Sequence, residues 1–268
     1  SHAAPGASVT ASIRLDVSPP LADIVLNAPA RRNALSIAMW AALPGLVAEA
    51  NANPDVKVLL IHGGDAGAFA AGADISEFET IYATPEQAQA SGEIIAAALN
   101  AVESSRKPVI AAIEGACVGG GVSLALACDL RVASETSKFG ITPAKLGLVY
   151  PPGDTRRLLA TVGPGTAKDL LFTGRIFLAP EAKELGLIDR VTAKGDALAQ
   201  ARGLAQEVGA VSQWSVQAIK QMISGLMSDW GDDHPEAQRL FVEGFSNEDF
   251  QDGYRAFLEK RAPSFTFK

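Results

Sequence analysis

The sequence has few of the residues that build metal centres or disulfide frameworks. Its 268 residues include two cysteines, Cys117 and Cys128, and three histidines, His2, His62 and His234. Two thiols cannot form a disulfide framework or a four-thiolate zinc site, and the histidines show no metal-ligand spacing. We therefore expect no metal site, and we expect both cysteines to be small buried residues.

The chain also lacks a cationic excess and a long apolar run. Twenty-three Lys and Arg against thirty Asp and Glu give a net charge of −7. Nucleic-acid binding depends on basic side chains that neutralise phosphates, so no nucleic-acid partner is expected. No apolar run approaches the roughly 20 residues that span a membrane, and residues 1–6 look like a loose tail without a targeting signal. We expect a cytoplasmic protein with no membrane partner.

What is present predicts a large globular core. Hydrophobic residues make up 48% of the chain and charged residues 20%, which is typical of a folded protein rather than a disordered one. Residues 9–17 alternate between polar and apolar and predict a half-buried strand, which Pro19-Pro20 separates from a second strand at residues 22–26. The two strands predict a hairpin. A helix capped by Ser36 follows, with a kink or break expected at Pro44-Gly45.

Two apolar runs, residues 56–61 and 108–113, predict strands buried on both faces, with a helix between them at 85–102. This order is typical of a βαβ unit. Each strand leads into a small-residue segment and then a helix (the second at 122–127), which indicates a structural repeat of about fifty residues. The chain beyond residue 180 predicts mostly helices, which we place at 180–187, 197–208, 215–227 and 235–261.

Two segments rich in small residues, 69–74 and 115–121, are candidates for binding. Small residues let a ligand approach the backbone closely, and the N–H groups in the first turn of a helix have no intrahelical acceptor. Two such donors from different loops can form an oxyanion hole. The alternative is a tight turn or a packing contact. Gly119, Gly121 and Leu124 do not fit G-x-G-x-x-G, and Gly121-Val122-Ser123-Leu124-Ala125 does not fit G-x-S-x-G, so a dinucleotide site and a nucleophilic serine are not expected.

Several motifs, in the same order along nearly the whole chain, resemble those of the crotonase superfamily, the enoyl-CoA hydratase/isomerase family. They are Leu26-Asn27-Ala28-Pro29 with Asn33-Ala34-Leu35-Ser36, Ala68-Phe69-Ala70-Ala71-Gly72-Ala73-Asp74, Lys107-Pro108-Val109-Ile110-Ala111-Ala112-Ile113-Glu114-Gly115, the triple glycine with Ala127-Cys128-Asp129, Phe139-Gly140, Leu146-Gly147-Leu148, Ala182 with Gly186-Leu187-Ile188-Asp189, and Phe257-Leu258-Glu259-Lys260-Arg261-Ala262-Pro263.

The resemblance implies an α/β fold: a ββα spiral core over residues 7–195 with the acyl-CoA site, then a C-terminal helical trimerisation section over 196–268. It implies a homotrimer or a hexamer, and an acyl-CoA thioester substrate with coenzyme A as part of that substrate and no separate cofactor. The backbone N–H groups of Ala73 and Gly120 would form an oxyanion hole for the thioester carbonyl as it gains enolate character. Residues implied in coenzyme A binding are Arg32, Ala34, Ala71, Gly72, Asp74 and, toward a neighbouring subunit, Phe257 and Lys260.

The sequence departs from the family at both catalytic glutamates. Ser123 and Pro143 stand in their places, and a serine without a partner is a weak base. Asp154, Glu77 and Tyr150 are the candidate replacements, with Thr142 a further candidate to position a water. Their alternative roles are a helix N-cap for Asp154, a solvated helix residue for Glu77 and plain packing for Tyr150.

The sequence therefore predicts an acyl-CoA enzyme of the enoyl-CoA hydratase/isomerase type, a lyase or an isomerase, with Ala73, Gly120, Asp154, Glu77 and Ser123 as its candidate catalytic residues. The alternative is a catalytically silent oligomer that binds acyl-CoA, which the missing glutamates favour.

Overall fold

The computed structural model describes residues 12–268 and contains two sheets. The larger sheet has six strands in the order β1-β2-β3-β4-β6-β9. Their bounds are Ile13–Ser18 (β1), Leu21–Leu26 (β2), Val58–His62 (β3), Val109–Ile113 (β4), Leu130–Ser134 (β6) and Arg190–Thr192 (β9). β1 and β2 pair antiparallel, and every other pair in this sheet is parallel.

The predicted hairpin is confirmed, because β1 pairs with β2 from Ile13 opposite Leu26 to Ser18 opposite Leu21. The part of the first predicted strand at residues 9–11 lies outside the described residues. The two buried strands predicted from apolar runs are β3 and β4, and all of their residues are buried.

A second, three-stranded sheet accounts for the spiral. It consists of β5 (Ala116–Val118), β7 (Lys138–Gly140) and β8 (Phe177–Leu178). β5 follows directly after β4, and β7 follows β6, so each turn of the chain contributes one strand to each sheet. Ala70, which follows β3, forms a parallel bridge with Cys117 of β5 and adds an equivalent third turn. The predicted repeat and the α/β spiral core are thus present.

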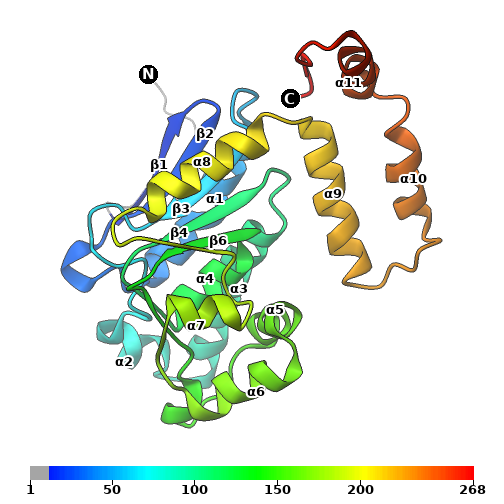
Figure 1. Ribbon diagram of the computed structural model, residues 1–268. Coiled ribbons are helices and arrows are strands. Elements are labelled where there is room, and N and C mark those ends of the chain that lie inside the picture. Colours follow the sequence, from blue (N-terminus) through cyan, green and yellow to red (C-terminus); the bar gives the residue numbers. More distant parts are fainter. Residues whose placement is uncertain (1–11) are drawn as a thin grey trace, which may run out of the picture.

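Helices cover both faces of the larger sheet (Figure 1). Alternate residues of β3 and β4 point to opposite faces: Leu59 and Val109 join the cluster that includes α1 (Ile37–Ala52), α3 (Pro85–Glu103) and α4 (Gly120–Ala127), whereas Leu60 and Ile110 pack against α8 (Ala197–Gly209). The other short elements are η1 (Pro29–Arg31), η2 (Ile75–Glu77), α2 (Phe78–Ile81), η3 (Pro143–Leu146), α5 (Pro152–Val162), α6 (Pro164–Thr173) and α7 (Ala179–Glu184).

The structure narrows one helix prediction and corrects another. A kink or a break was expected at Pro44-Gly45, and α1 continues through Pro44 without a break; Leu43 and Leu46, on either side of the proline, are both buried in the core. Their burial offsets the one backbone hydrogen bond that a proline removes. The helix predicted over 235–261 is two helices, α10 (Pro235–Glu243) and α11 (Glu248–Glu259), because Asn247 caps α11 by accepting a hydrogen bond from the Phe250 N–H.

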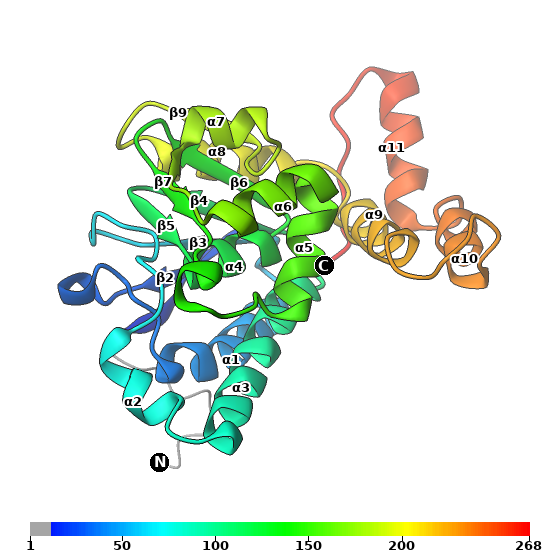
Figure 2. The same ribbon diagram turned by 90° about the horizontal axis from the view of Figure 1, so that it is seen from below.

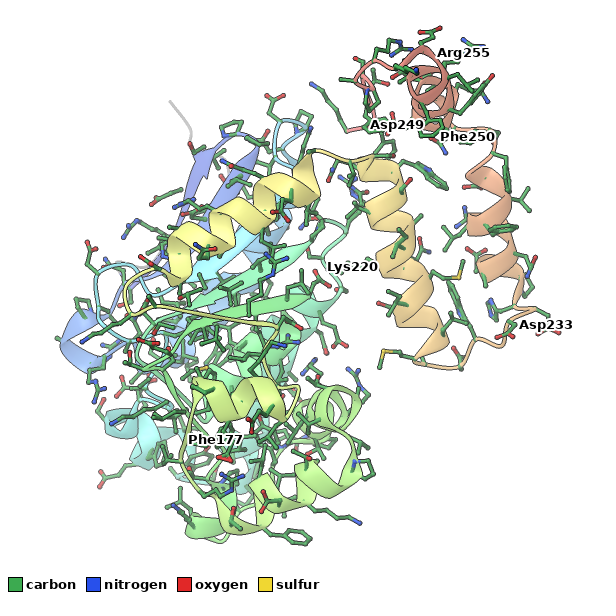
Figure 3. The ribbon with its side chains drawn as sticks, viewed as in Figure 1. Phe177, Lys220, Asp233, Asp249, Phe250 and Arg255 are labelled. Atoms are coloured by element: carbon green, nitrogen blue, oxygen red, sulfur yellow. The ribbon has the colours of Figure 1, made fainter. Side chains whose placement is uncertain are left out.

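The last three helices, α9 (Gln213–Leu226), α10 and α11, extend away from the body of the molecule (Figures 1 and 2). An ion pair between Lys220 of α9 and Asp129 (2.8 Å) joins them to the spiral, and a bond from Ser212 to Asp249 (2.7 Å) ties α9 to α11. Figure 3 shows Lys220 on the side of α9 that faces the sheets. α8 packs on the larger sheet. The division of the chain into a core over residues 7–195 and a helical section over 196–268 stays a prediction.

No helix between residues 12 and 268 is long and apolar enough to cross a membrane.

Candidate active site

The two small-residue segments lie side by side at the small sheet. The Ala70 N–H donates to Ala116 O (3.0 Å) and the Val118 N–H donates to Ala70 O (3.1 Å). A Cβ built on Gly119 would lie 3.8 Å from the Cα of Gly72. Gly119 has φ of 56° and ψ of −115°, a conformation that side chains strongly disfavour, so this close approach depends on glycine. The spiral thus brings together two loops about fifty residues apart in sequence.

The N–H group of Ala73 has no hydrogen-bond partner among residues 12–268. Leu35 pairs with the residues on either side: its N–H donates to Gly72 O (2.9 Å) and its carbonyl accepts from the Asp74 N–H (3.4 Å). In a parallel bridge of this kind, the residue between the two bonds directs its own N–H away from the partner segment. The Ala73 N–H is therefore available to a ligand.

Gly120 is the first residue of α4, and its N–H likewise has no partner within the described part of the chain. The first N–H groups of a helix lack an intrahelical acceptor and carry the positive end of the helix dipole. A Cβ built on the next residue, Gly121, would lie 2.6 Å from Ala70 O. α4 therefore begins in direct contact with the other loop, and a side chain at position 121 would force the two loops apart.

Ser123, one turn into α4, is the centre of a buried polar cluster. Its Oγ lies 2.8 Å from the Tyr150 hydroxyl, and it donates to Asp154 Oδ2 at 2.9 Å. All three side chains are at most 7% exposed. Two of the residues predicted as catalytic, Ser123 and Asp154, are thus in direct contact. Tyr150 has a hydrogen-bonding role rather than the plain packing that was its alternative.

Asp154 lies in the first turn of α5, and its carboxylate does not cap that helix. It accepts hydrogen bonds from Ser123 and, through Oδ1, from Arg157 Nη1 at 3.2 Å. The alternative role as an N-cap is therefore wrong. Burial raises the pKa of Asp154, against the opposing effects of the Ser123 hydrogen bond and the Arg157 charge. A carboxylate with a raised pKa accepts a proton more readily than an ordinary one.

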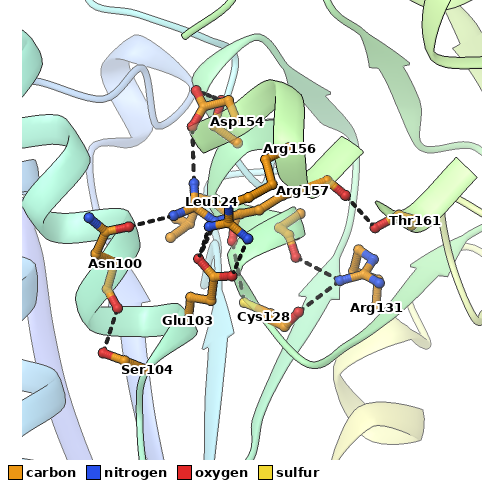
Figure 4. A network of polar contacts seen from close by, with 12 residues as sticks. Asn100, Glu103, Ser104, Leu124, Cys128, Arg131, Asp154, Arg156, Arg157 and Thr161 are labelled. Carbon is orange, nitrogen blue, oxygen red and sulfur yellow. Dashed lines mark hydrogen bonds and ion pairs between the residues drawn. The ribbon is translucent and has the colours of Figure 1, made fainter. Parts of the chain in front are cut away.

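Arg157, which is not among the residues predicted from the sequence, extends this cluster to α3 (Figure 4). Its Nε donates to Glu103 at 2.7 Å and its Nη2 to Asn100 at 2.8 Å. Glu103 also accepts two bonds from Arg156, at 2.9 Å each. Burial opposes ionisation of Glu103, but the hydrogen bonds from the two arginines hold its pKa below the ordinary value. The only sequence signal was the spacing of Asp154 and Arg157, three apart on one helix.

Glu77 lies apart from the Ser123 cluster. It is half-buried, and its carboxylate accepts a hydrogen bond from the Ile37 N–H at 2.9 Å, at the start of α1. It is therefore neither simply solvated nor joined to Ser123. Thr142 precedes η3 and forms no side-chain cap there.

The residues implied in coenzyme A binding fall into two groups. Arg32, Ala34, Ala71, Gly72 and Asp74 lie on adjoining segments: the Ala71 N–H donates to Arg32 O at 3.0 Å, and the Arg32 side chain is exposed. The buried Asp74 carboxylate accepts from Ser76 and lies 3.4 Å from Arg31 Nε.

Phe257 and Lys260 belong to the second group, on and just after α11, which extends away from the spiral (Figure 1). Phe257 is 83% exposed. Within one chain, these two residues are not part of the group around Gly72.

The two cysteines and His62 lie in buried, structural positions. Cys117 and Cys128 are unpaired and buried, as predicted, and burial raises the pKa of both thiols. Among residues 12–268, no three or more His, Cys, Asp or Glu side chains come together in a way that could hold a metal ion. His62, at the end of β3, bonds to the buried Asp23 at 2.8 Å and accepts from the Gly64 N–H.

A spiral of ββα turns with C-terminal helices is the crotonase fold, and solved structures agree. A crystal structure of an enoyl-CoA hydratase/isomerase family protein from Hyphomonas neptunium has a TM-score of 0.95 and 72% identity, over 96% of this chain and 98% of the other. The family model for enoyl-CoA hydratase/isomerase matches residues 17–268. This chain therefore belongs to the enoyl-CoA hydratase/isomerase family.

Curated relatives agree with this assignment. The enoyl-CoA hydratase/isomerase YngF of Bacillus subtilis is 36% identical to this chain, over 90% of this chain and 92% of its own length. The crotonyl-CoA hydratase of Syntrophomonas wolfei is 33% identical, over 96% of this chain and 98% of its own.

Proposed function

We propose that this protein is an acyl-CoA thioester enzyme that stabilises a thioester enolate with the backbone N–H groups of Ala73 and Gly120. The observation that carries the proposal is that both N–H groups lack partners among residues 12–268 and belong to two loops in direct contact. Two N–H donors aimed at a developing oxyanion lower its energy by several kcal/mol, and loss of one such donor costs about 3 kcal/mol of barrier. Family membership supports the thioester as the substrate class.

Coenzyme A enters this proposal as part of the substrate, with no separate cofactor. Its pantetheine and nucleotide would lie along the segments that hold Arg32, Ala34, Ala71, Gly72 and Asp74. Because Phe257 and Lys260 lie on a distant helix, they would serve the site of a neighbouring copy. This requires an oligomer, a trimer or a hexamer.

Exposed apolar residues on the C-terminal helices support self-association. A groove of about 390 Å³ lies between α9 and α10. It is lined by large apolar side chains, among them Ile219, Ile223, Phe241, Phe245 and Phe250, each at least 41% exposed. Apolar surface gathered in this way is typical of an interface between proteins.

Neither position of the family's glutamate pair carries an acid here, so hydration through such a pair is not expected. The test is the addition of water to crotonyl-CoA, together with calorimetric binding of butyryl-CoA. We expect butyryl-CoA to bind and crotonyl-CoA hydration to be slow. A failure of every acyl-CoA to bind would overturn the proposed substrate class, and fast hydration would show that water is activated without the pair.

The second candidate is a silent oligomer that binds acyl-CoA without turnover. The observation that favours it is that Ser123 and Pro143 offer no carboxylate of their own. A panel of saturated and unsaturated acyl-CoA thioesters separates the two: binding without any chemical change in the thioester supports the silent protein.

A further inference from the structure

The hydroxyl groups of Tyr150 and Ser123 form an ordered chain that ends at Asp154. Ser123 has a single hydroxyl proton and gives it to Asp154 Oδ2 at 2.9 Å. The 2.8 Å contact between Ser123 and Tyr150 must then be a bond that the phenol donates and the Ser123 oxygen accepts. Both protons therefore point toward the carboxylate. If Asp154 carries a proton, the same atoms can bond in the opposite order.

Asp154 is held so that only one of its oxygens faces the hydroxyl chain. Arg157 donates to Oδ1, and Arg157 itself is fixed by Glu103 and Asn100 (Figure 4). Oδ2 is left to Ser123. Asp154 is 5% exposed, and burial raises its pKa, which makes the carboxylate a better proton acceptor than an ordinary aspartate.

The chain begins close to the proposed oxyanion hole. Ser123 Oγ lies 3.4 Å from the carbonyl oxygen of Gly119, the peptide group that carries the Gly120 N–H on its opposite side, so the middle of the hydroxyl chain is one helical turn from the proposed hole. The outer end of the chain is the Tyr150 oxygen, which has no partner other than Ser123 among residues 12–268. It therefore keeps a lone pair that can accept a proton.

We propose that Tyr150, Ser123 and Asp154 form a proton relay that removes and returns the α-proton of the bound acyl thioester, in place of the missing glutamates. This inference rests on the proposed function. The α C–H bond breaks and its proton bonds to the Tyr150 oxygen. The phenol's own proton passes to Ser123 Oγ, and the serine proton passes to Asp154 Oδ2. The C–H electron pair forms the enolate, whose oxygen the Ala73 and Gly120 N–H groups hold.

In this relay one negative charge moves from Asp154 to the enolate oxygen, so atoms and charge balance without any further reactant. Tyr150 is the catalytic residue, because it touches the substrate. Ser123 and Asp154 act through it, and Arg157 positions the carboxylate. The reverse transfer returns a proton to the enolate.

The test is the exchange of the α-protons of butyryl-CoA in D₂O, followed by NMR, because it reports enolate formation without any net reaction. We expect the wild type to exchange them. Tyr150→Phe and Asp154→Asn should each slow exchange by about 100-fold or more, the usual size of an acid–base contribution. Their calorimetric Kd for butyryl-CoA should stay within about threefold of the wild type.

Matched controls make the same chemical changes elsewhere. Tyr82→Phe removes an exposed phenol hydroxyl, and Asp169→Asn neutralises a carboxylate on the surface of α6. Both should exchange as the wild type does. Because a structural role for Asp154 would move stability but not a pH profile, the wild-type exchange rate is also measured against pH. As the pH is lowered, the wild-type exchange rate should fall at a pH above the ordinary aspartate pKa of about 4. The exchange rate of Asp154→Asn should show no such fall.

The outcomes separate the relay from the proposed function. Binding of butyryl-CoA without exchange in the wild type would overturn the relay and leave the ligand class intact. Exchange that survives in both Tyr150→Phe and Asp154→Asn would also overturn it. An absence of binding in the wild type would overturn the proposed function itself. If Asp154→Asn fails to fold, Tyr150→Phe alone decides the question, because it keeps the ring and removes only the hydroxyl.

Discussion

The carboxylate of Glu77 accepts a hydrogen bond from the backbone N–H of Ile37 at 2.9 Å, across forty residues of sequence. Ile37 is the first residue of α1, and Ser36 caps the same helix by accepting from the Met39 N–H. Two residues thus fix the start of α1: Ser36, which directly precedes the helix, and Glu77, from the segment that follows Ala73. A negative charge at this place also complements the helix dipole.

We predict that Glu77→Ala lowers the free energy of unfolding by about 1 kcal/mol, since the variant leaves the Ile37 N–H without its acceptor. Urea denaturation measures the change. Glu79→Ala, two residues away and exposed, is the matched control and should be near neutral. A Glu77→Ala protein of unchanged stability that loses α-proton exchange would instead assign Glu77 a part in the chemistry.

Two glycine substitutions should have opposite effects. A Cβ at Gly121 would lie 2.6 Å from the backbone oxygen of Ala70, whereas a Cβ at Gly92, inside α3, has nothing within 4 Å. Gly121→Ala should destabilise the fold by about 2 kcal/mol, as overpacking does, and should weaken butyryl-CoA binding because it separates the two loops. Gly92→Ala should stabilise it by about 0.5–1 kcal/mol. Thermal unfolding and calorimetry test both, and equal stabilities for the two variants would contradict the close contact.

The fold was predictable because its signals are local. The apolar runs at β3 and β4 and the Pro19-Pro20 turn each specify an element within a few residues. The continuation of α1 through Pro44 was not, because it depends on the burial of Leu43 and Leu46 against strands distant in sequence.

The site was predictable only in part, because its contacts join residues that are distant in sequence. Ser123 and Asp154 could be proposed one at a time, but the bond between them joins residues 31 apart. The link from Arg157 to Asn100 and Glu103 crosses more than fifty residues. No periodicity or motif in the sequence encodes such contacts, which arise from the way α3, α4 and α5 pack together.

Self-association should depend on the apolar face of α10. Phe241 and Phe245 pack edge to face, with ring centroids 5.3 Å apart, and they are 62% and 57% exposed. We expect the native mass by light scattering to be three or six times 27.8 kDa, and the double change Phe241→Asp, Phe245→Asp to dissociate the oligomer. Val17→Asp, at an exposed apolar residue of β1, is the control and should not. A wild-type protein that is monomeric at micromolar concentration would contradict the proposed trimer.

Two aspartates that face each other across the β1–β2 hairpin provide a further test. Asp16 and Asp23 are register partners, yet Asp16 is exposed and pairs with the exposed Arg14, whereas Asp23 is 6% exposed and bonds to His62 and Arg202. Burial acts to raise the pKa of Asp23, but the hydrogen bonds from His62 and Arg202 outweigh it and hold this pKa below the ordinary value.

Asp23→Asn should therefore lower the free energy of unfolding by about 2 kcal/mol at pH 7, because it removes a charged acceptor from a mostly buried pair. A depressed pKa contributes stability above the unfolded-state value of about 3.9, and this contribution is lost as the pH falls through the folded-state pKa. The difference between wild type and variant should accordingly be constant from pH 7 to about pH 5 and shrink below about pH 4. Asp16→Asn should cost less than about 1 kcal/mol at every pH. Urea denaturation of the three proteins across this range decides the matter, and an Asp23→Asn cost that does not shrink in acid would show that the charge of Asp23 is not what the cluster stabilises.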